Sequence, residues 1–309
     1  MRILVLGGDG MLGHQLLLSL QKHHTVCVSL RQSAEAYRDY PLFNQNNSYF
    51  NIDVRDDQPL LNILKDCKPE AVINAVGVIK QRQQAMDAMI NIEINALFPH
   101  RLAKLCKITA VRMVHFSTDC VFSGRQGQYT EADLSDAKDF YGKSKYLGEV
   151  QERHCITLRT SVIGLELARK ASLIEWFLSQ TGNLTGFRRA IYSGLTTIEM
   201  ARVVERLLIN YPTLSGVWHV ASQTPINKYD LLVELSHFLN RQDIQIKPDD
   251  SFVCDRSLIG DAFSQQTGYI SPSWPVMLKE LAEAVEAREA NNNRPTQTIN
   301  HPHIAQVVQ

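Results

Sequence analysis

The sequence predicts an α/β protein with a doubly wound parallel sheet and a smaller C-terminal lobe. Three observations carry this prediction. Short apolar runs alternate with segments of helical spacing, a glycine-rich turn follows the first apolar run, and the alternation loosens after about residue 160. Alternating strands and helices favour a parallel sheet that helices cover on both faces.

Six apolar runs in the first half are each expected to form a strand. The run at 3–6 is wholly apolar and ends at glycines, as a strand buried on both faces does. The other runs are 26–28, 49–52, 71–73, 111–116 and 155–158. Helices are expected between them, where apolar residues recur at helical spacing, over 11–22, 60–64, 91–106 and 141–152.

The second half is less regular. Helices are expected over 173–178, 198–208, 231–239 and 277–287, with a short strand over 217–220. We therefore expect a sheet domain over 1–160 and a lobe over 161–290 that is interleaved with the last strands. Residues 291–309 are polar and are expected to form a flexible tail.

Composition excludes some classes of function. The chain has 309 residues, of which 44% are hydrophobic, enough for a large core. Lys+Arg and Asp+Glu are equal at 32 each, so there is no strong basic field for nucleic acid or an anionic membrane. Without a run of about 20 apolar residues, no membrane span is expected.

The cysteines indicate a reducing compartment. No two of them are close enough in sequence to make a metal-ligand pair, and several lie in apolar runs, as reduced core cysteines do. They are Cys27, Cys67, Cys106, Cys120, Cys155 and Cys254. We therefore expect a cytoplasmic protein without a disulfide framework. His301 and His303 in the tail are too few to indicate a metal site, so no metal is expected.

A glycine pattern follows the first strand. Gly7, Gly10 and Gly13 are spaced as G-x-x-G-x-x-G, and the expected helix opens at Met11 and Leu12. Gly7 would allow the tight turn, Gly10 the approach of a pyrophosphate, and Gly13 close packing of helix on sheet. Phosphates would then lie at the helix N-terminus, whose N–H groups and dipole favour anions. This context predicts a Rossmann-type dinucleotide site in the domain 1–160.

The end of the second strand bears on the choice of cofactor. A carboxylate that binds the ribose of NAD is expected there, but the sequence has Arg31 and no acid. A guanidinium suits a 2′-phosphate, so NADP is favoured, with NAD possible. The alternative is a solvent-exposed arginine. Asp53, followed by Val54, is a candidate ligand for the adenine amino group, or else the N-cap of the next helix.

Tyr141 and Lys145 are four residues apart and so share one face of a helix. A nearby ammonium stabilises a phenolate and is expected to lower the pKa of Tyr141, so that the phenol can exchange a proton with a carbonyl or alcohol. Thr118 ends the fifth strand, where doubly wound sheets bind ligands. The alternative for Tyr141 and Lys145 is an ordinary pair of side chains on the helix surface. The alternative for Thr118 is a cap at the end of the strand.

Several motifs in one order resemble the extended short-chain dehydrogenase/reductase family, in the branch of dTDP-4-dehydrorhamnose reductase. The resemblance spans about residues 1–281. Besides the glycine loop, it rests on these segments: Asn74-Ala75-Val76-Gly77, Asn95, 117–124 (STDCVFSG), Glu131 and Asp133, Tyr141-Gly142-Lys143-Ser144-Lys145, 147–149 (LGE), 158–161 (LRTS), and 267–275 (TGYISPSWP).

The resemblance implies roles for particular residues. Thr118, Tyr141 and Lys145 would form the catalytic triad that reduces C4 of a hexose on a nucleoside diphosphate. Tyr141 and Lys145 would also contact the cofactor, with Lys145 holding the nicotinamide ribose. The turn Ala75-Val76-Gly77 and Asn95 would flank or support the cofactor. Candidate substrate ligands in the strand-end loops and the 161–290 lobe are Lys80, Asp119, Cys120, Trp176 and Arg188, with Arg189 and Arg256 as further cations for the diphosphate. Dimers are common in the family, so a homodimer is possible.

Departures from the family pattern leave alternatives open. Cys120 stands where the reductases usually have Tyr, and no Glu follows Thr118-Asp119, so dehydratase chemistry is disfavoured. A nucleotide-sugar 4-epimerase remains an alternative. So does a non-catalytic, cofactor-binding subunit, because the regulatory subunit of methionine adenosyltransferase resembles the same branch. For Lys80, Trp176 and Arg188, solvated or structural roles are the alternatives.

Overall fold

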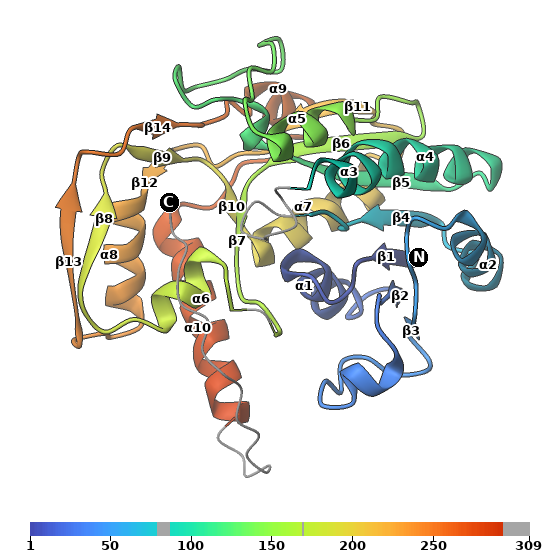
Figure 1. Ribbon diagram of the computed structural model, residues 1–309, viewed down its shortest axis with the longest axis horizontal. Coiled ribbons are helices and arrows are strands. Elements are labelled where there is room, and N and C mark those ends of the chain that lie inside the picture. Colours follow the sequence, from blue (N-terminus) through green and yellow to red (C-terminus); the bar gives the residue numbers. More distant parts are fainter. Residues whose placement is uncertain (79–86, 169, 293–309) are drawn as a thin grey trace.

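A parallel sheet forms the centre of the protein (Figure 1). The computed structural model describes residues 1–78, 87–168 and 170–292. Within these residues the sheet has seven strands in the order β11-β6-β5-β4-β1-β2-β3, and every neighbouring pair is parallel. They are β1 (Arg2–Leu6), β2 (Thr25–Ser29), β3 (Ser48–Tyr49), β4 (Ala71–Asn74), β5 (Arg112–Thr118), β6 (Cys155–Thr160) and β11 (Gly216–His219). The chain reverses its direction of growth between β1 and β4, so the predicted doubly wound fold is confirmed.

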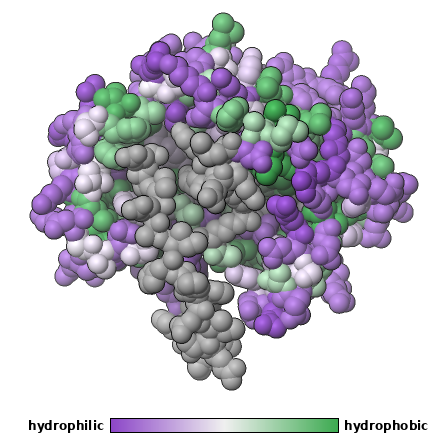
Figure 2. All heavy atoms as spheres, in the orientation of Figure 1, coloured by the Kyte–Doolittle hydropathy of each residue, from purple (hydrophilic) through white to green (hydrophobic). Residues whose placement is uncertain are grey.

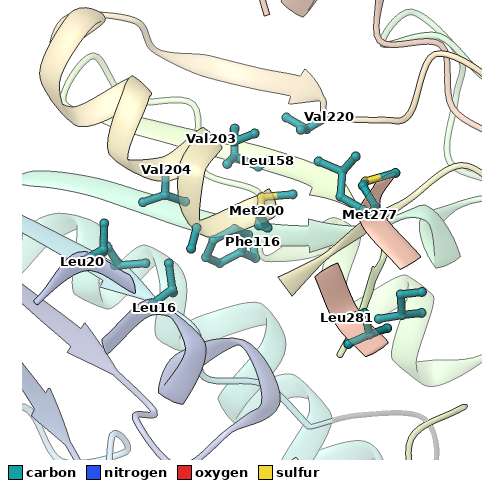
Figure 3. Packing of buried hydrophobic residues seen from close by; sticks show 14 of the residues in the cluster. Leu16, Leu20, Phe116, Leu158, Met200, Val203, Val204, Val220, Met277 and Leu281 are labelled. Atoms are coloured by element: carbon teal, nitrogen blue, oxygen red, sulfur yellow. The ribbon is translucent and has the colours of Figure 1, made fainter. Parts of the chain in front are cut away.

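Helices cover both faces of the sheet. On one face, α1 (Met11–Leu20) packs beside α7 (Thr197–Asn210). Figure 3 shows Leu16 of α1, Val204 of α7 and Phe116 of β5 pointing into one shared core. On the other face, α2 (Asp57–Cys67) and α4 (Phe98–Ile108) cover a second core. Strand residues alternate between the two cores, since Ile3 and Val5 face one while Leu4 and Leu6 face the other.

The second half builds a lobe from small sheets. Their orders are β10-β7, β12-β9-β14 and β13-β8, joined by α6 (Leu173–Leu178), α8 (Lys228–Phe238), α9 (Asp261–Thr267) and α10 (Trp274–Asn292). The strands are β7 (Val162–Ile163), β8 (Gly182–Phe187), β9 (Ala190–Tyr192), β10 (Leu195–Thr196), β12 (Ile226–Asn227), β13 (Ile244–Asp249) and β14 (Cys254–Asp255). The chain also returns to the central sheet to add β11, so the halves are interleaved.

Two expected helices differ from the structure. The helix expected over 91–106 consists of α3 (Ala88–Asn91), a π-helical segment η3 (Ile92–Leu97), and α4. The helix expected over 141–152 is α5 (Phe140–Leu147) and stops at Gly148. Gly148 touches the carbonyl of Asn95 so closely that a Cβ there would lie 1.9 Å from that oxygen. The contact fixes α5 against η3.

The surface and the interior differ in polarity. The face in Figure 2 is mostly hydrophilic, and its hydrophobic atoms occur in small groups. Among the described residues, no helix combines the length and the apolarity that a membrane crossing needs. Cys67, Cys106 and Cys155 are buried, whereas Cys27, Cys120 and Cys254 are half-buried. The tail from residue 293 onwards lies outside the described residues.

Candidate active site

A pocket opens where the sheet changes direction, at the C-terminal ends of β1, β2 and β4. It is lined by Gly7, Asp9, Gly10, Ser29, Arg31, Ile52, Asp53, Val54, Arg55, Ala75, Val76, Gly77, Val78, Ile90 and Ile94. The predicted cofactor residues from the glycine loop, the second strand end and the turn after β4 therefore meet in one place. Met11, Leu12 and Gly13 begin α1 beside the pocket and are not among its lining residues.

The glycine loop has the conformation that its spacing predicts. Gly7 has a φ of +81°, which a side chain would strain. A Cβ on Gly13 would lie 2.0 Å from the carbonyl oxygen of Gly7, so only glycine permits this packing. Gly10 is the N-cap of α1 and offers no side chain to its first N–H groups, which are left for an anion. These features fit a dinucleotide pyrophosphate.

Charged groups line the adenosine end of the pocket. Arg55 donates to Asp53 at 2.6 Å and lowers the pKa of that carboxyl to about 2. Arg31 is exposed and also stabilises the Asp53 carboxylate. Asp56, rather than Asp53, caps α2, accepting from the N–H of Gln58 at 2.9 Å, so the capping alternative for Asp53 is wrong. Two guanidinium groups at this end favour an anionic ligand group.

Buried asparagines hold the turn after β4. Asn74 accepts the N–H of Val76 at 3.1 Å. Asn95, which is fully buried in η3, accepts the N–H of Val78 at 2.9 Å and donates to its carbonyl at 3.1 Å. The same side chain donates to the hydroxyl of Ser144 on α5 at 3.3 Å. Asn95 therefore supports the pocket wall from behind and connects it to the helix that carries Tyr141.

Thr118, Tyr141 and Lys145 meet at the end of β5. The hydroxyl of Thr118 accepts the N–H of Cys120 at 3.1 Å, so it does cap a strand end. It also hydrogen-bonds the phenol of Tyr141, which is half-buried. The ammonium of Lys145 is 5% exposed and donates to the carbonyl of Phe116 at 2.5 Å. Three candidate catalytic side chains thus gather around the last residues of one strand.

One electrostatic expectation is wrong. Burial raises the pKa of Tyr141 above its usual value, despite the opposing hydrogen bond from Thr118. Lys145 is not among the groups that shift the pKa of Tyr141, and its ammonium instead donates to the carbonyl of Phe116. Burial also lowers the pKa of Lys145 to about 8. The phenol is therefore protonated at neutral pH, which is the state that a proton donor requires.

The predicted substrate ligands lie in different surroundings. Asp119 and Cys120 follow Thr118 in the short helix η4 (Asp119–Val121), and burial raises the pKa of Asp119. Arg188 instead forms an exposed ion pair with Asp250, its Nε donating at 2.9 Å, so its charge is already compensated. Trp176 packs against the main core, as the structural alternative proposed. Lys80 lies outside the described residues.

A buried ion pair supports the ends of β5 and β6. The sequence motifs contain its residues, but the sequence analysis did not predict the pair. Arg159 of β6 binds both carboxylate oxygens of Glu149, at 2.7 and 2.8 Å, and the hydroxyl of Ser117 donates to Glu149 at 2.7 Å. Arg159 also donates to Nε2 of His219 on β11 at 3.2 Å, and Glu131 accepts the N–H of His219 at 2.9 Å. The motif residues Glu131, Glu149 and Arg159 were the signal for this network. No cluster of three or more potential metal ligands occurs in the described ranges.

Comparison with known proteins identifies the family. The model of the family described as RmlD substrate binding domain matches residues 1–253 of this chain. The chain belongs to this family. The resemblance to the dTDP-4-dehydrorhamnose reductase branch is therefore confirmed.

Individual RmlD-family relatives are distant and carry different names. dTDP-4-dehydrorhamnose reductase of Aggregatibacter actinomycetemcomitans is 24% identical over 250 residues, covering 76% of this chain and 78% of that protein. Methionine adenosyltransferase 2 subunit beta of Mus musculus is 21% identical over 276 residues, covering 84% and 77%. The crystal structure of dTDP-4-dehydrorhamnose reductase from Bacillus anthracis, in complex with NADP, has a TM-score of 0.74 at 18% identity and covers 92% of this chain and 99% of that one. This last likeness shows the fold.

Proposed function

We propose that this protein is an NAD(P)H-dependent reductase of the 4-keto group of a nucleotide-diphosphate sugar. The observation that carries the proposal is the meeting of Thr118, Tyr141 and Lys145 at the end of β5, next to the elements that hold the pocket. Family membership and the names of the reductase relatives support it.

In the proposed reaction, each of these side chains has a separate task. The nicotinamide cofactor, when bound, supplies the hydride for C4. Tyr141 donates its phenolic proton to the C4 oxygen as negative charge develops there, and burial keeps that proton in place until then. The hydroxyl of Thr118, which donates to Asp119 at 3.1 Å in the structure, would donate to the same C4 oxygen and stabilise the charge. Lys145 would hold the nicotinamide ribose of the bound cofactor and supply a buried positive charge there.

The pocket residues favour NADP over NAD. Gly7, Gly10 and the N-terminus of α1 would hold the pyrophosphate, and Asn95 keeps the turn Ala75-Val76-Gly77 in place. Arg31 and Arg55 lie at the adenosine end, where a 2′-phosphate would add negative charge. The substrate's sugar would lie over Asp119 and Cys120.

The test is turnover of NADPH with a panel of 4-keto nucleotide sugars, followed by absorbance. Tyr141→Phe should lower kcat by about 100-fold or more, because a general acid contributes roughly 10²–10⁴-fold. Its affinity for NADPH should stay unchanged. Tyr146→Phe is the matched control, since Tyr146 is on the same helix and is 41% exposed. Full activity in Tyr141→Phe would refute the proposed proton donor.

Two alternatives give different results in the same assay. A 4-epimerase would interconvert nucleotide sugars on tightly bound NAD, with no net consumption of NADPH. The second alternative is that this protein is a regulatory subunit. It is supported by the relatives named methionine adenosyltransferase 2 subunit beta. It would bind NADPH, turn over none of the sugars, and form a complex with a methionine adenosyltransferase catalytic subunit in size-exclusion chromatography.

A further inference from the structure

Two cysteines far apart in sequence touch each other outside the candidate active site. Cys27 lies in the middle of β2, and Cys67 is the last residue of α2. Their thiols form a hydrogen bond. Cys67 is 4% exposed and belongs to the core under α2, while Cys27 is half-buried at the edge of that core. Cys27 is therefore the more exposed residue of the pair, and Cys67 is the more buried one.

The surroundings make the two thiols unequal. The hydrogen bond from Cys67 lowers the pKa of Cys27, and Arg2 adds a smaller effect in the same direction. The guanidinium of Arg2 is fixed nearby, because its Nη1 donates to the carbonyl of Cys67 at 2.9 Å. The hydrogen bond and burial raise the pKa of Cys67. Cys27 is thus the more acidic thiol of the pair.

A second pair in the same core provides a comparison. Cys106 of α4 and Cys155 of β6 are close enough for their charges to interact, and both are 0% exposed. Burial raises the pKa of each, and neither has a cation that outweighs this effect. Cys106 and Cys155 therefore lack the exposure and the thiolate character on which thiol oxidation depends.

We propose that Cys27 and Cys67 are a reversible redox pair, in which a hydroperoxide oxidises Cys27 and Cys67 then closes a disulfide. The Cys27 thiolate attacks the peroxide, so that an S–O bond forms, the O–O bond breaks, and one water leaves after protonation (an alcohol for an organic hydroperoxide). The Cys67 sulfur then attacks the sulfenic acid, so that the S–S bond forms, the S–O bond breaks, and water leaves. With hydrogen peroxide, two thiols and one peroxide give one disulfide and two waters. An external dithiol reverses the reaction by exchange.

The position of the pair connects it to the cofactor pocket. β2 ends at Ser29, and Arg31 follows two residues later; α2 begins at Asp57, two residues after Arg55. Ser29, Arg31, Asp53 and Arg55 line the pocket, so a disulfide would join the strand and the helix that flank these pocket residues in the chain.

The test uses the full-length wild-type protein and hydrogen peroxide. After a short exposure to about one equivalent, the protein is denatured, the remaining thiols are alkylated with N-ethylmaleimide, and the digest is mapped by mass spectrometry. The expected product is a single cross-linked peptide containing Cys27 and Cys67, with the other four cysteines alkylated. Dithiothreitol should restore six reactive thiols. This readout depends neither on catalytic activity nor on whether a variant folds.

Variants separate the roles of the two thiols. Cys67→Ala should leave Cys27 as a sulfenic acid that dimedone captures, whereas Cys27→Ala should leave Cys67 unoxidised. Cys155→Ala is the control, and in it the 27–67 cross-link should form as in the wild type. The proposal is overturned if peroxide leaves Cys27 as a free thiol in the folded wild-type protein, or if cross-links involving other cysteines form as readily.

Discussion

Lys145 is a charged side chain in a largely apolar position. Its ammonium is 5% exposed and donates to the carbonyl of Phe116. Burial lowers its pKa from 10.5 to about 8, so the unfolded chain holds this proton more tightly than the folded protein does. Between pH 8 and 10.5, the unfolded state therefore carries more protons, and stability rises with pH in this window.

This linkage predicts a pH-dependent effect of Lys145→Met. The free energy of unfolding of the wild type, relative to the variant, should increase by on the order of 1–3 kcal/mol from pH 7 to pH 10. Guanidinium unfolding curves at both pH values measure it. Lys143→Met, two residues earlier and exposed on the same helix, should show no such change. If the difference in free energy of unfolding between the wild type and Lys145→Met is the same at both pH values, burial does not lower the pKa of Lys145.

Single residues differ in how well their sequence revealed them. The proximity of Thr118, Tyr141 and Lys145 could be predicted, because Tyr141 and Lys145 are four residues apart and Thr118 ends a strand. The sequence did not show that Asp250, 62 residues away, would pair with Arg188. Nor did it show that a backbone carbonyl would engage Lys145. Partners that are distant in sequence follow from the packed lobe, and no local spacing encodes them.

At the scale of elements, the glycine loop allows a comparison between two glycines: one that must be glycine for close packing, Gly13, and one that has more room, Gly10. Gly13→Ala should lower stability by about 1–3 kcal/mol, because its Cβ would overlap the carbonyl of Gly7. Gly10→Ala should lose less stability than Gly13→Ala, since its Cβ would come no closer than 3.3 Å to that oxygen and its φ is −73°. Thermal melting checks both. A higher melting temperature for Gly13→Ala than for Gly10→Ala would show that the packing of residue 13 on Gly7 does not require glycine.

Element prediction succeeded where the residues repeat regularly. Six strands of the central sheet and α6 were located from apolar runs and helical spacing, whereas the strand expected over 49–52 overlaps β3 only at Tyr49. The seven short strands of the lobe were not, because strands of two to six residues among turns leave little or no periodic pattern. The π-helical segment η3 was also missed. Within it, Asn95 bonds Val78 and Ser144, which are distant in sequence, and π-helical turns often occur at functional sites.

On the scale of the whole molecule, His219 joins the two halves of the chain. Its Nε2 accepts from Arg159, and its Nδ1 bonds the carbonyl of Tyr129 at 3.1 Å, so the ring is neutral and fully bonded. Burial, followed by the charge of Arg159, lowers its pKa to about 4. The unfolded chain takes up this proton near pH 6.5, so stability should fall as the pH drops from 6.5 toward 4.

His219→Gln isolates this contribution. A glutamine keeps one acceptor and one donor but does not titrate. Relative to the wild type, the variant should gain about 2 kcal/mol in free energy of unfolding between pH 7 and pH 5. Denaturant unfolding at both pH values measures the gain, and His237→Gln on the exposed side of α8 is the control. If both variants respond to pH alike, His219 is not the group that titrates.

The place of β11 in the sheet also affects how the protein is made. Residues 216–219 supply the strand that covers the outer edge of β6. A nascent chain that has reached residue 160 therefore carries the nucleotide-binding motifs but presents an open strand edge, which invites pairing with other chains. The ribosome must add about sixty more residues before that edge is covered. Dissection of the gene at the apparent lobe boundary would leave the same edge open.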